Sequence, residues 1–244
     1  MAILKKDTIL YNDLTIPVEI NIERRNSVRA AIGKKAAIIR LPVHLPISER
    51  EHHIVRMKQW VVEQFSKDAR LKQRFTQKTY RQGDTLIVGE RTYIVDIQYV
   101  NEDVTHKGQL KNGIMQLRIN ANAADLQSSI ATLLSRLAAK DALPQLSRRV
   151  HELNHLYFRQ PIGTISLKYN HSNWGSCSTS SNLNFSTRLL FAPPSVVDYV
   201  IIHELAHLLE MNHSPRFWKL VADAMPDYTT YERWLKANSH LCFF

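Results

Sequence analysis

Two copies of the pattern H-E-x-x-H occur in the chain. HELNH begins at His151, and HELAH begins at His203. In an α-helix, positions i and i+4 lie one above the other on the same face. Two imidazoles at this spacing can bind one zinc ion, while the Glu after the first His reaches a water that the metal activates. The pattern therefore predicts a zinc hydrolase, but it does not decide which copy is the site.

The surroundings of HELNH predict an exposed helix face. One face of its helix is apolar and should be buried: Leu146, Val150, Leu153 and Tyr157. At about 100° per residue, His151 and His155 fall nearly opposite that face. Pro161 lies ten residues after His151 and cannot bind a metal. We therefore expect these two histidines to face water.

The surroundings of HELAH predict a buried site. The segment VVDYVIIHELAHLL is apolar on nearly all sides, and we expect Ser195 to cap its helix with Asp198 as the capping-box acid. Its polar exceptions after the first turn are His203, Glu204, His207 and Glu210. Burying such groups unpaired costs ~1–3 kcal/mol each. A bound metal is the simplest compensation, and a buried hydrogen-bonded cluster is the alternative.

His213 is the expected third ligand. It lies ten residues after His203, the offset of the third His in the metzincin pattern H-E-x-x-H-x-x-G-x-x-H. Glu210 lies on the same face of the predicted helix as His203 and His207 and is the alternative ligand. Because Glu210 is close to the helix end, we expect it to orient a histidine instead.

The chain must turn back toward the metal before His213. Glu210 stands where the metzincin pattern has Gly, so we expect the turn at Met211-Asn212, where Asn tolerates the left-handed conformation. Ser214-Pro215 then starts a new helix.

Composition places the chain among globular proteins. Its 244 residues are 44% hydrophobic and 22% charged, with no run of about 18 apolar residues and no signal peptide pattern at the start. The two cysteines, Cys177 and Cys242, do not make a disulfide framework. We therefore expect a cytoplasmic protein with no membrane partner.

Positive charge is concentrated in the first half of the chain. The net charge is +10, and residues 1–120 hold 21 of the 32 Lys/Arg but 13 of the 22 Asp/Glu. The densest stretch is KDARLKQRFTQKTYR, from Lys67 to Arg81. It is interpreted either as a surface for nucleic acid or nucleotide phosphates or as a solvated helix end and loop. We favour the second, because no nucleic-acid-binding module is recognisable.

The order of elements predicts an α+β fold with a domain boundary near residue 122. Residues 1–122 read as a β-rich basic region with strands over 3–47 and 80–120 and one helix, which starts in a capping box of Ser48 and Glu51. Glycines at 83, 89, 108 and 113 are expected to mark turns. We see no internal repeat beyond the doubled pentapeptide.

Residues 123–244 read as a mostly helical domain. ADLQSSIATLLSRLAAKDAL is one predicted helix, and Pro144 opens the next, which carries HELNH. The strand TISLKYN and the hairpin-like NWGSCSTSSNLNFSTRLL follow. After them come the HELAH helix and two shorter helices.

The last third of the chain resembles a known family. The segment from NWGSC to ERWLK looks like the YgjP-type (DUF45) metallopeptidase-like family, which is related to SprT and WLM zinc proteases. The matching residues are Trp174, Gly175, Ser176, Cys177, Pro194, Asp198, Tyr199, Val200, His203, Glu204, His207, Asn212, His213, Phe217 and Trp218. Asn173, where the family usually has a basic residue, and a missing Gly in STSSNL depart from it.

The resemblance implies a zincin-like metallohydrolase domain with one Zn2+ per chain. The zinc would be held by His203, His207 and His213, with Glu204 as the general base that takes a proton from the attacking water. Tyr228 and Tyr231 are both candidates for stabilising the developing oxyanion.

The segment NLNFSTRLL is our candidate edge strand for aligning a peptide, with WGSC as the turn that delivers it. We expect Trp174 to anchor the core and Cys177 to be a buried structural thiol.

Three functions remain open from the sequence. The first is a zinc metallopeptidase acting on a protein or peptide. The second is a metal-dependent nucleotide phosphohydrolase that uses the same site, although no Walker-type G-x-x-x-x-G-K-[ST] run is present. The third is a non-catalytic zinc-binding module, which would not need Glu204 as a base.

Overall fold

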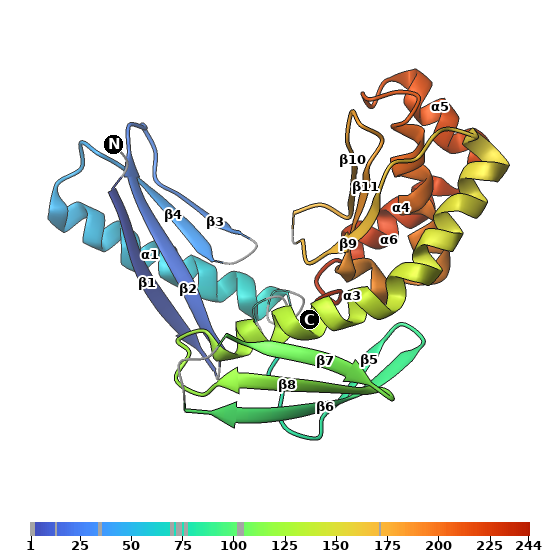
Figure 1. Cartoon of the computed structure of the whole chain (residues 1–244). Helices are drawn as coiled ribbons and strands as arrows, with labels where there is room; N and C mark the ends of the chain where they lie inside the picture. Colours follow the sequence, from blue (N-terminus) through green and yellow to red (C-terminus); the bar gives the residue numbers. More distant parts are fainter. Residues whose placement is uncertain are drawn as a thin grey trace. The chain divides into compact units, whose positions relative to one another are not determined.

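The computed structural model describes residues 3–12, 14–33, 36–68, 71, 75, 78–101, 105–170 and 172–244 (Figure 1). The chain forms two compact units, Met1–Gln77 and Lys78–Phe244. The boundary expected near residue 122 therefore falls inside the second unit, because helix α3 (Leu126–Leu153) packs on strand β8 (Ile114–Asn120), which precedes it. The predicted α+β fold class is confirmed, with β-strands dominating the first 122 residues.

The first unit is a four-stranded sheet with one helix. Its strand order is β1-β2-β4-β3, in which β2 and β4 are parallel and the outer pairs antiparallel. The elements are β1 (Ile3–Tyr11), β2 (Leu14–Glu23), β3 (Arg29–Ile32), β4 (Ala37–Pro42) and α1 (Ile47–Lys67). Helix α1 packs Phe65 on the sheet. The expected capping box does not form, because Pro46 occupies the N-cap position and no side chain caps the helix.

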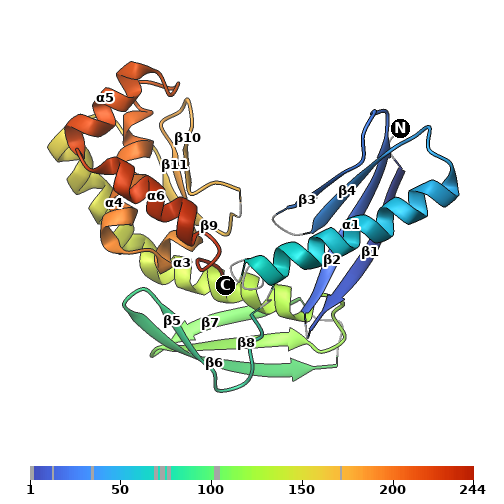
Figure 2. The ribbon, with the colours of Figure 1, turned by 180° about the vertical axis from the view of Figure 1, so that it is seen from behind.

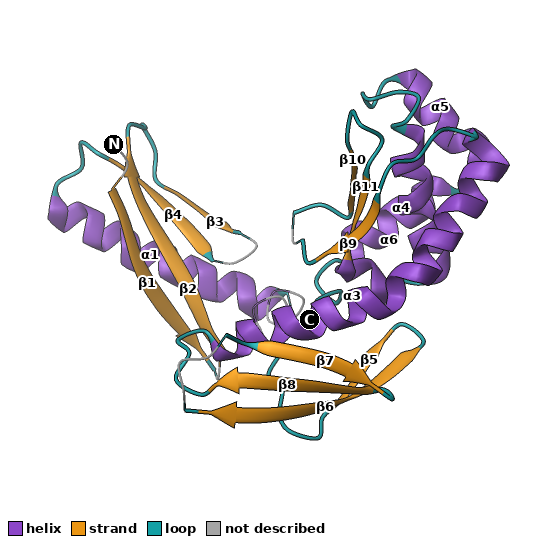
Figure 3. Ribbon diagram, in the orientation of Figure 1, coloured by secondary structure: helices purple, strands orange, loops and turns teal. Residues whose placement is uncertain are grey.

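The second unit begins with a sheet of the same design. Its order is β5-β6-β8-β7, again with a parallel inner pair and antiparallel outer pairs, and α3 follows as α1 does in the first unit (Figure 3). The other strands are β5 (Thr85–Val88), β6 (Arg91–Val100) and β7 (Lys107–Lys111). The chain therefore contains an internal ββββα repeat, which we did not detect in the sequence.

Gly108 is a strand residue rather than the turn residue we expected. It lies in β7, and a Cβ atom there would stand 2.9 Å from Leu117 Cδ2 and 3.2 Å from Leu137 Cδ1. The missing side chain thus lets α3 approach the sheet closely. Gly83, Gly89 and Gly113 do have the positive φ angles expected of turn glycines.

Helix α3 is continuous through Pro144, where we expected a second helix to start. A proline inside a helix removes one hydrogen bond. Here the helix packs on the β5–β8 sheet with its first half and buries Leu146 and Val150 in the next core with its second half (Figure 2). This packing on both sides of Pro144 keeps the helix intact.

The end of α3 differs from a regular helix. A π-helical turn, Asn154–Phe158, follows Leu153 and ends at Arg159, whose φ is 53°. A π turn advances the buried face by five residues instead of four. Phe158 is therefore buried, and Tyr157, which we expected on the buried face, is 50% exposed.

The remaining elements build the region around HELAH. They are β9 (Ile165–Lys168), β10 (Gly175–Cys177), β11 (Leu183–Ser186), α4 (Pro194–Ala206), α5 (Pro215–Ala224) and α6 (Tyr228–Asn238). The strands form a sheet of order β10-β11-β9, and β10 and β11 make the expected hairpin. However, the edge strand that we placed in NLNFSTRLL is wrong, because β11 is the central strand and β10 lies at the edge.

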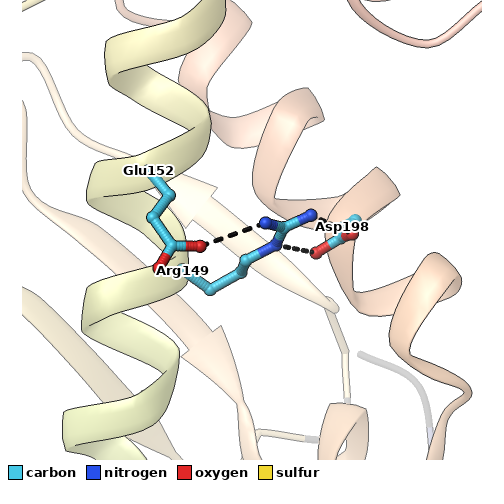
Figure 4. A network of polar contacts seen from close by, with 3 residues as sticks. All are labelled: Arg149, Glu152 and Asp198. Carbon is cyan, nitrogen blue, oxygen red and sulfur yellow. Dashed lines mark hydrogen bonds and ion pairs between the residues drawn. The ribbon is translucent and has the colours of Figure 1, made fainter.

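An ion-pair network joins α3 to α4 (Figure 4). The guanidinium of Arg149 donates to both carboxylate oxygens of Asp198, at 2.8 and 2.7 Å, and also to Glu152 at 3.0 Å. Asp198 therefore does not act as a capping-box acid. Helix α4 begins at Pro194 without a side-chain cap, so the expected cap at Ser195 is also wrong.

Residues 69, 70, 72–74, 76 and 77 of the basic stretch Lys67–Arg81 lie outside the described residues. None of the described helices has the length and apolar composition needed to cross a membrane.

The burial of Phe158 by the π-helical turn can be tested by mutation. Phe158→Ala should lower the free energy of unfolding by about 3–5 kcal/mol because it empties a buried site. The matched change Tyr157→Ala should alter it by less than about 0.5 kcal/mol, because that ring is half exposed. Urea unfolding of the two variants measures both values. A larger loss for Tyr157→Ala would mean that the helix continues without the π turn.

Candidate metal centre

Three imidazoles converge at the end of α4. His203 and His207 come from the HELAH segment and His213 from the chain before α5, and their ligand nitrogens all lie within 4.8 Å of one another. The Nε2 atoms of His203 and His213 are 3.1 Å apart. Tetrahedral coordination at 2.0–2.1 Å separates two nitrogen ligands by about 3.3 Å. The cluster is the only group of three or more His, Cys, Asp or Glu side chains with this geometry in the described part of the chain.

Phe217 is the shared support of the three rings. Its side chain is fully buried, and its ring centroid lies 4.9, 4.5 and 4.8 Å from those of His203, His207 and His213. Helix α5 delivers it, starting at Ser214, whose Oγ accepts from the Phe217 backbone N–H as expected of a cap. Trp218 stacks on His213 from the next position. The rings are thus fixed by packing.

The chain between α4 and α5 turns where we expected, but without a left-handed conformation at Asn212. Helix α4 ends at Ala206, and the backbone N–H groups of Leu209 and Glu210 both bond to its carbonyl. Asn212 does not adopt a positive φ. The backbone carbonyl of Glu210 lies 3.0 Å from His207 Nδ1 and leaves Nε2 for the cluster. Glu210 thus contacts a histidine through its main chain, and its carboxylate is not part of the cluster.

Burial controls the charge of these groups. The pKa of His203 is lowered to about 3, first by burial and then by the neighbouring His207 and His213. Burial likewise lowers the pKa of His207. Burial raises the pKa of Glu204 to about 8. Neutral imidazoles are the form that binds a metal, and a carboxylate with a pKa near neutrality suits a proton acceptor.

Gly175 makes room for Glu204. A Cβ atom on Gly175 would lie 2.6 Å from Glu204 Oε1 and 2.9 Å from its Cδ. Strand β10 therefore lies directly against the carboxylate, which is buried and has no hydrogen-bond partner in the described part of the chain. We did not predict this contact. The only feature of the sequence that could have indicated this contact is the glycine of the WGSC motif, because that motif precedes the second strand of a predicted hairpin.

Arg188 is a second residue that the sequence did not single out. Its buried guanidinium stacks over the Trp174 ring at 4.2 Å and donates to the backbone carbonyls of Cys242 at 2.9 Å and Ser239 at 2.7 Å. Trp174 packs against the core around α4, as expected. Arg188 thereby fixes the residue that precedes Gly175.

The other singled-out side chains lie nearby but do not join the cluster. Cys177 is half-buried in β10, and burial and the charge of Glu204 raise its thiol pKa, which disfavours a metal-binding thiolate. Tyr228 stacks on Trp218, with ring centroids 5.4 Å apart. Tyr231 contacts Tyr199 instead, at 6.4 Å.

The HELNH histidines are exposed, as expected. His151 lies in the last turn of α3 and His155 in the π-helical turn, and neither belongs to the described metal-type cluster.

Most of the chain matches the model of one protein family. Residues 26–238 match the model of the YgjP-like metallopeptidase domain. The chain belongs to the YgjP-like metallopeptidase family. The resemblance that we found in the last third of the sequence is therefore confirmed over most of the chain. This YgjP-like protein is a metal-dependent peptidase by family, and its family implies a divalent metal and a protein substrate.

Two solved structures resemble part of this YgjP-like protein. One is the metallopeptidase zymogen abylysin of Pyrococcus abyssi, with 18% identity and a TM-score of 0.35, covering 38% of this chain and 93% of that one. The other is the zymogen jannalysin of Methanocaldococcus jannaschii, with 22% identity and a TM-score of 0.34, covering 39% and 96%. Among curated proteins, no sequence matches.

The contact between Gly175 and Glu204 can be tested by Gly175→Ala. The added methyl group must displace the carboxylate, and a displacement of about 1 Å can lower kcat about 100-fold. Bound metal per chain should stay unchanged. The control is Gly108→Ala, where a Cβ also meets a side chain at 2.9 Å but on the β5–β8 sheet. Equal losses of kcat in both variants would contradict a specific role for Gly175.

The raised pKa of Glu204 predicts a pH-dependent stability. In metal-free protein the folded chain keeps the Glu204 proton up to about pH 8, whereas an unfolded Glu releases it near 4.5. The free energy of unfolding should therefore fall between pH 6.5 and 8. The lowered pKa of His203 has the opposite effect, but only below 6.5.

Denaturant unfolding of chelator-treated wild type and Glu204→Gln, at several pH values across this window, measures the effect. The decrease should be absent from Glu204→Gln. A variant that retained the full wild-type slope would show that another group is responsible.

Proposed function

We propose that the protein is a zinc-dependent peptidase in which Glu204 is the general base. The observation that carries this proposal is that Glu204 directly follows His203, one of the three converging imidazoles, and that its side chain is buried with no partner among the described residues. A buried carboxylate without a partner is costly to stability. Its retention next to a metal-type cluster is explained by a catalytic role.

The donor set favours zinc. Three neutral imidazoles suit zinc, whereas magnesium and manganese prefer oxygen ligands. His203, His207 and His213 would hold the ion through one nitrogen each and leave a fourth position open. Zinc, when bound, supplies a Lewis acid that makes water nucleophilic near neutral pH.

Glu204 would take the proton from the attacking water and pass it to the leaving amine. The raised pKa of about 8 describes the protein without a metal, and a nearby cation lowers the pKa of a carboxyl group. The carboxylate is then available as a base at neutral pH. The close approach of Gly175 confines this side chain from one side.

Strand β10 is the corrected candidate for aligning the peptide. Ser186 N donates to Trp174 O and Ser178 N donates to Asn182 O, so every second residue of β10 pairs with β11. The main-chain groups of Gly175 and Cys177 therefore point away from β11. Within the described part of the chain they are free to pair with an extended peptide at the edge beside Glu204.

Tyr228 is our candidate for stabilising the oxyanion. It connects to the cluster through a stack in which Trp218 lies between its ring and that of His213. Among the described ring contacts, Tyr231 reaches the site through Tyr199, which lies 6.1 Å from His203. No described contact favours the nucleotide phosphohydrolase, the nucleic-acid surface or the non-catalytic zinc module.

Casein cleavage by zinc-loaded protein tests the proposal. Glu204→Gln should reduce cleavage at least about 100-fold with zinc retained, because it removes the base and not a ligand. His203→Ala/His207→Ala should lose both zinc and activity. The matched pair His151→Ala/His155→Ala, on the exposed HELNH segment, should keep both.

Two outcomes would contradict the proposal. Full activity in Glu204→Gln would exclude a role as base. Phosphate release from nucleotides without casein cleavage would favour the phosphohydrolase.

A further inference from the structure

A polar pocket lies on the back of the strand that faces Glu204. It has a volume of about 550 Å³ and is open to solvent. Leu183 and Phe185 of β11 are buried in the core around α4, so Asn184 between them points to the opposite face of the sheet. Its register partners Ser176 and Ser166 point the same way.

The pocket is lined by hydrogen-bond donors. The Asn170 side-chain oxygen accepts from the Ser172 backbone N–H at 2.9 Å and hydroxyl at 2.8 Å, and the Asn184 side-chain oxygen accepts from the Ser166 hydroxyl at 2.6 Å. Each amide therefore keeps its NH2 group for a ligand.

Two further groups add to this donor set. In the described part of the chain, the Lys168 ammonium and the Ser176 hydroxyl have no hydrogen-bond partner, and no carboxylate lines the pocket. Two amide NH2 groups, a hydroxyl and an ammonium match the acceptor-only chemistry of an oxyanion.

Gly175 links this pocket to the metal centre. Its backbone lines the pocket, while the place of its missing Cβ is filled by the Glu204 side chain. An extended peptide paired with β10 directs alternate side chains to the two faces of the sheet. Those on one face point to the same side of the sheet as Glu204, and those on the Ser176 face lie beside Lys168 and Asn184.

We propose that this pocket binds a carboxylate of the peptide substrate and thereby selects acidic peptides. The proposal rests on the proposed peptidase function and on alignment along β10. The carboxylate comes either from an Asp or Glu side chain or from the peptide's own C-terminus. The two sources share one chemistry and are separated by the test below.

The first arm of the test measures cleavage. Mass spectrometry of a digested, denatured proteome gives the residues around each cleaved bond, and matched synthetic peptides then carry Glu or Gln at the enriched position, each with a free or an amidated C-terminus. We expect kcat/KM about tenfold higher with the carboxylate, and a ratio near one in Lys168→Met. The control Lys107→Met removes the same charge from β7 and should keep the preference.

Dependence on internal Glu identifies a side-chain carboxylate, and dependence on the free C-terminus identifies the terminal one. The same preference in Lys168→Met as in wild type would overturn the proposal, as would equal cleavage of all four peptides.

The second arm needs no turnover, so the pocket can be judged even if the protein cleaves no peptide. Sodium acetate is titrated into 15N-labelled, chelator-treated protein, with sodium chloride as the ionic-strength control. The Ser176 amide and the Asn184 side-chain NH2 signals should shift and saturate in wild type and Lys107→Met, but not in Lys168→Met. Signals that do not respond to acetate, or that respond equally in all three proteins, would exclude a carboxylate site.

Discussion

The burial of helix α4 on nearly all sides is the constraint from which the site follows. Its apolar side chains fill one hydrophobic core of the second unit, so His203 and Glu204 cannot turn to solvent without unpacking the helix. Polar groups held in such surroundings need partners or a function. Phe217 limits them further, because it touches all three imidazoles and leaves the rings little freedom to rearrange.

The rest of the second unit keeps α4 and β10 in place. Helix α3 packs on the β5–β8 sheet with one half and on the region around α4 with the other, and the Arg149–Asp198 pair ties it to the start of α4. On the far side, Arg188 joins Trp174 to the carbonyls of Ser239 and Cys242. The short edge strand that carries Gly175 is thus held at Trp174, the residue before it, through Arg188 and the C-terminal segment.

The convergence of His203, His207 and His213 could be expected from the sequence, because its signal is local. The i, i+4 spacing of His203 and His207 depends only on helical geometry, and His213 was found from its ten-residue offset. The exposed faces of His151 and His155 followed from the same periodicity. The helical periodicity gave the wrong buried face after Leu153, because a π turn there inserts one residue that the local sequence does not predict.

Other errors concern contacts between distant segments. Strand order depends on pairing partners, so the central position of β11 and the edge position of β10 could not be read from β11's own residues. The repeated ββββα design is carried by topology and not by similar side chains. The Asp198 carboxylate does not form the expected cap because it pairs with Arg149, which lies 49 residues earlier. Positions 108 and 175 need a glycine because a Cβ atom there would meet neighbouring residues that only the fold brings close.

The most direct test of the central claim is a crystal structure of zinc-loaded protein with anomalous scattering measured on both sides of the zinc absorption edge. The account predicts one strong peak per chain, about 2.0–2.1 Å from one nitrogen each of His203, His207 and His213, with Glu204 beside the open position. A peak at His151 and His155, or none among the three imidazoles at full zinc occupancy, would contradict it.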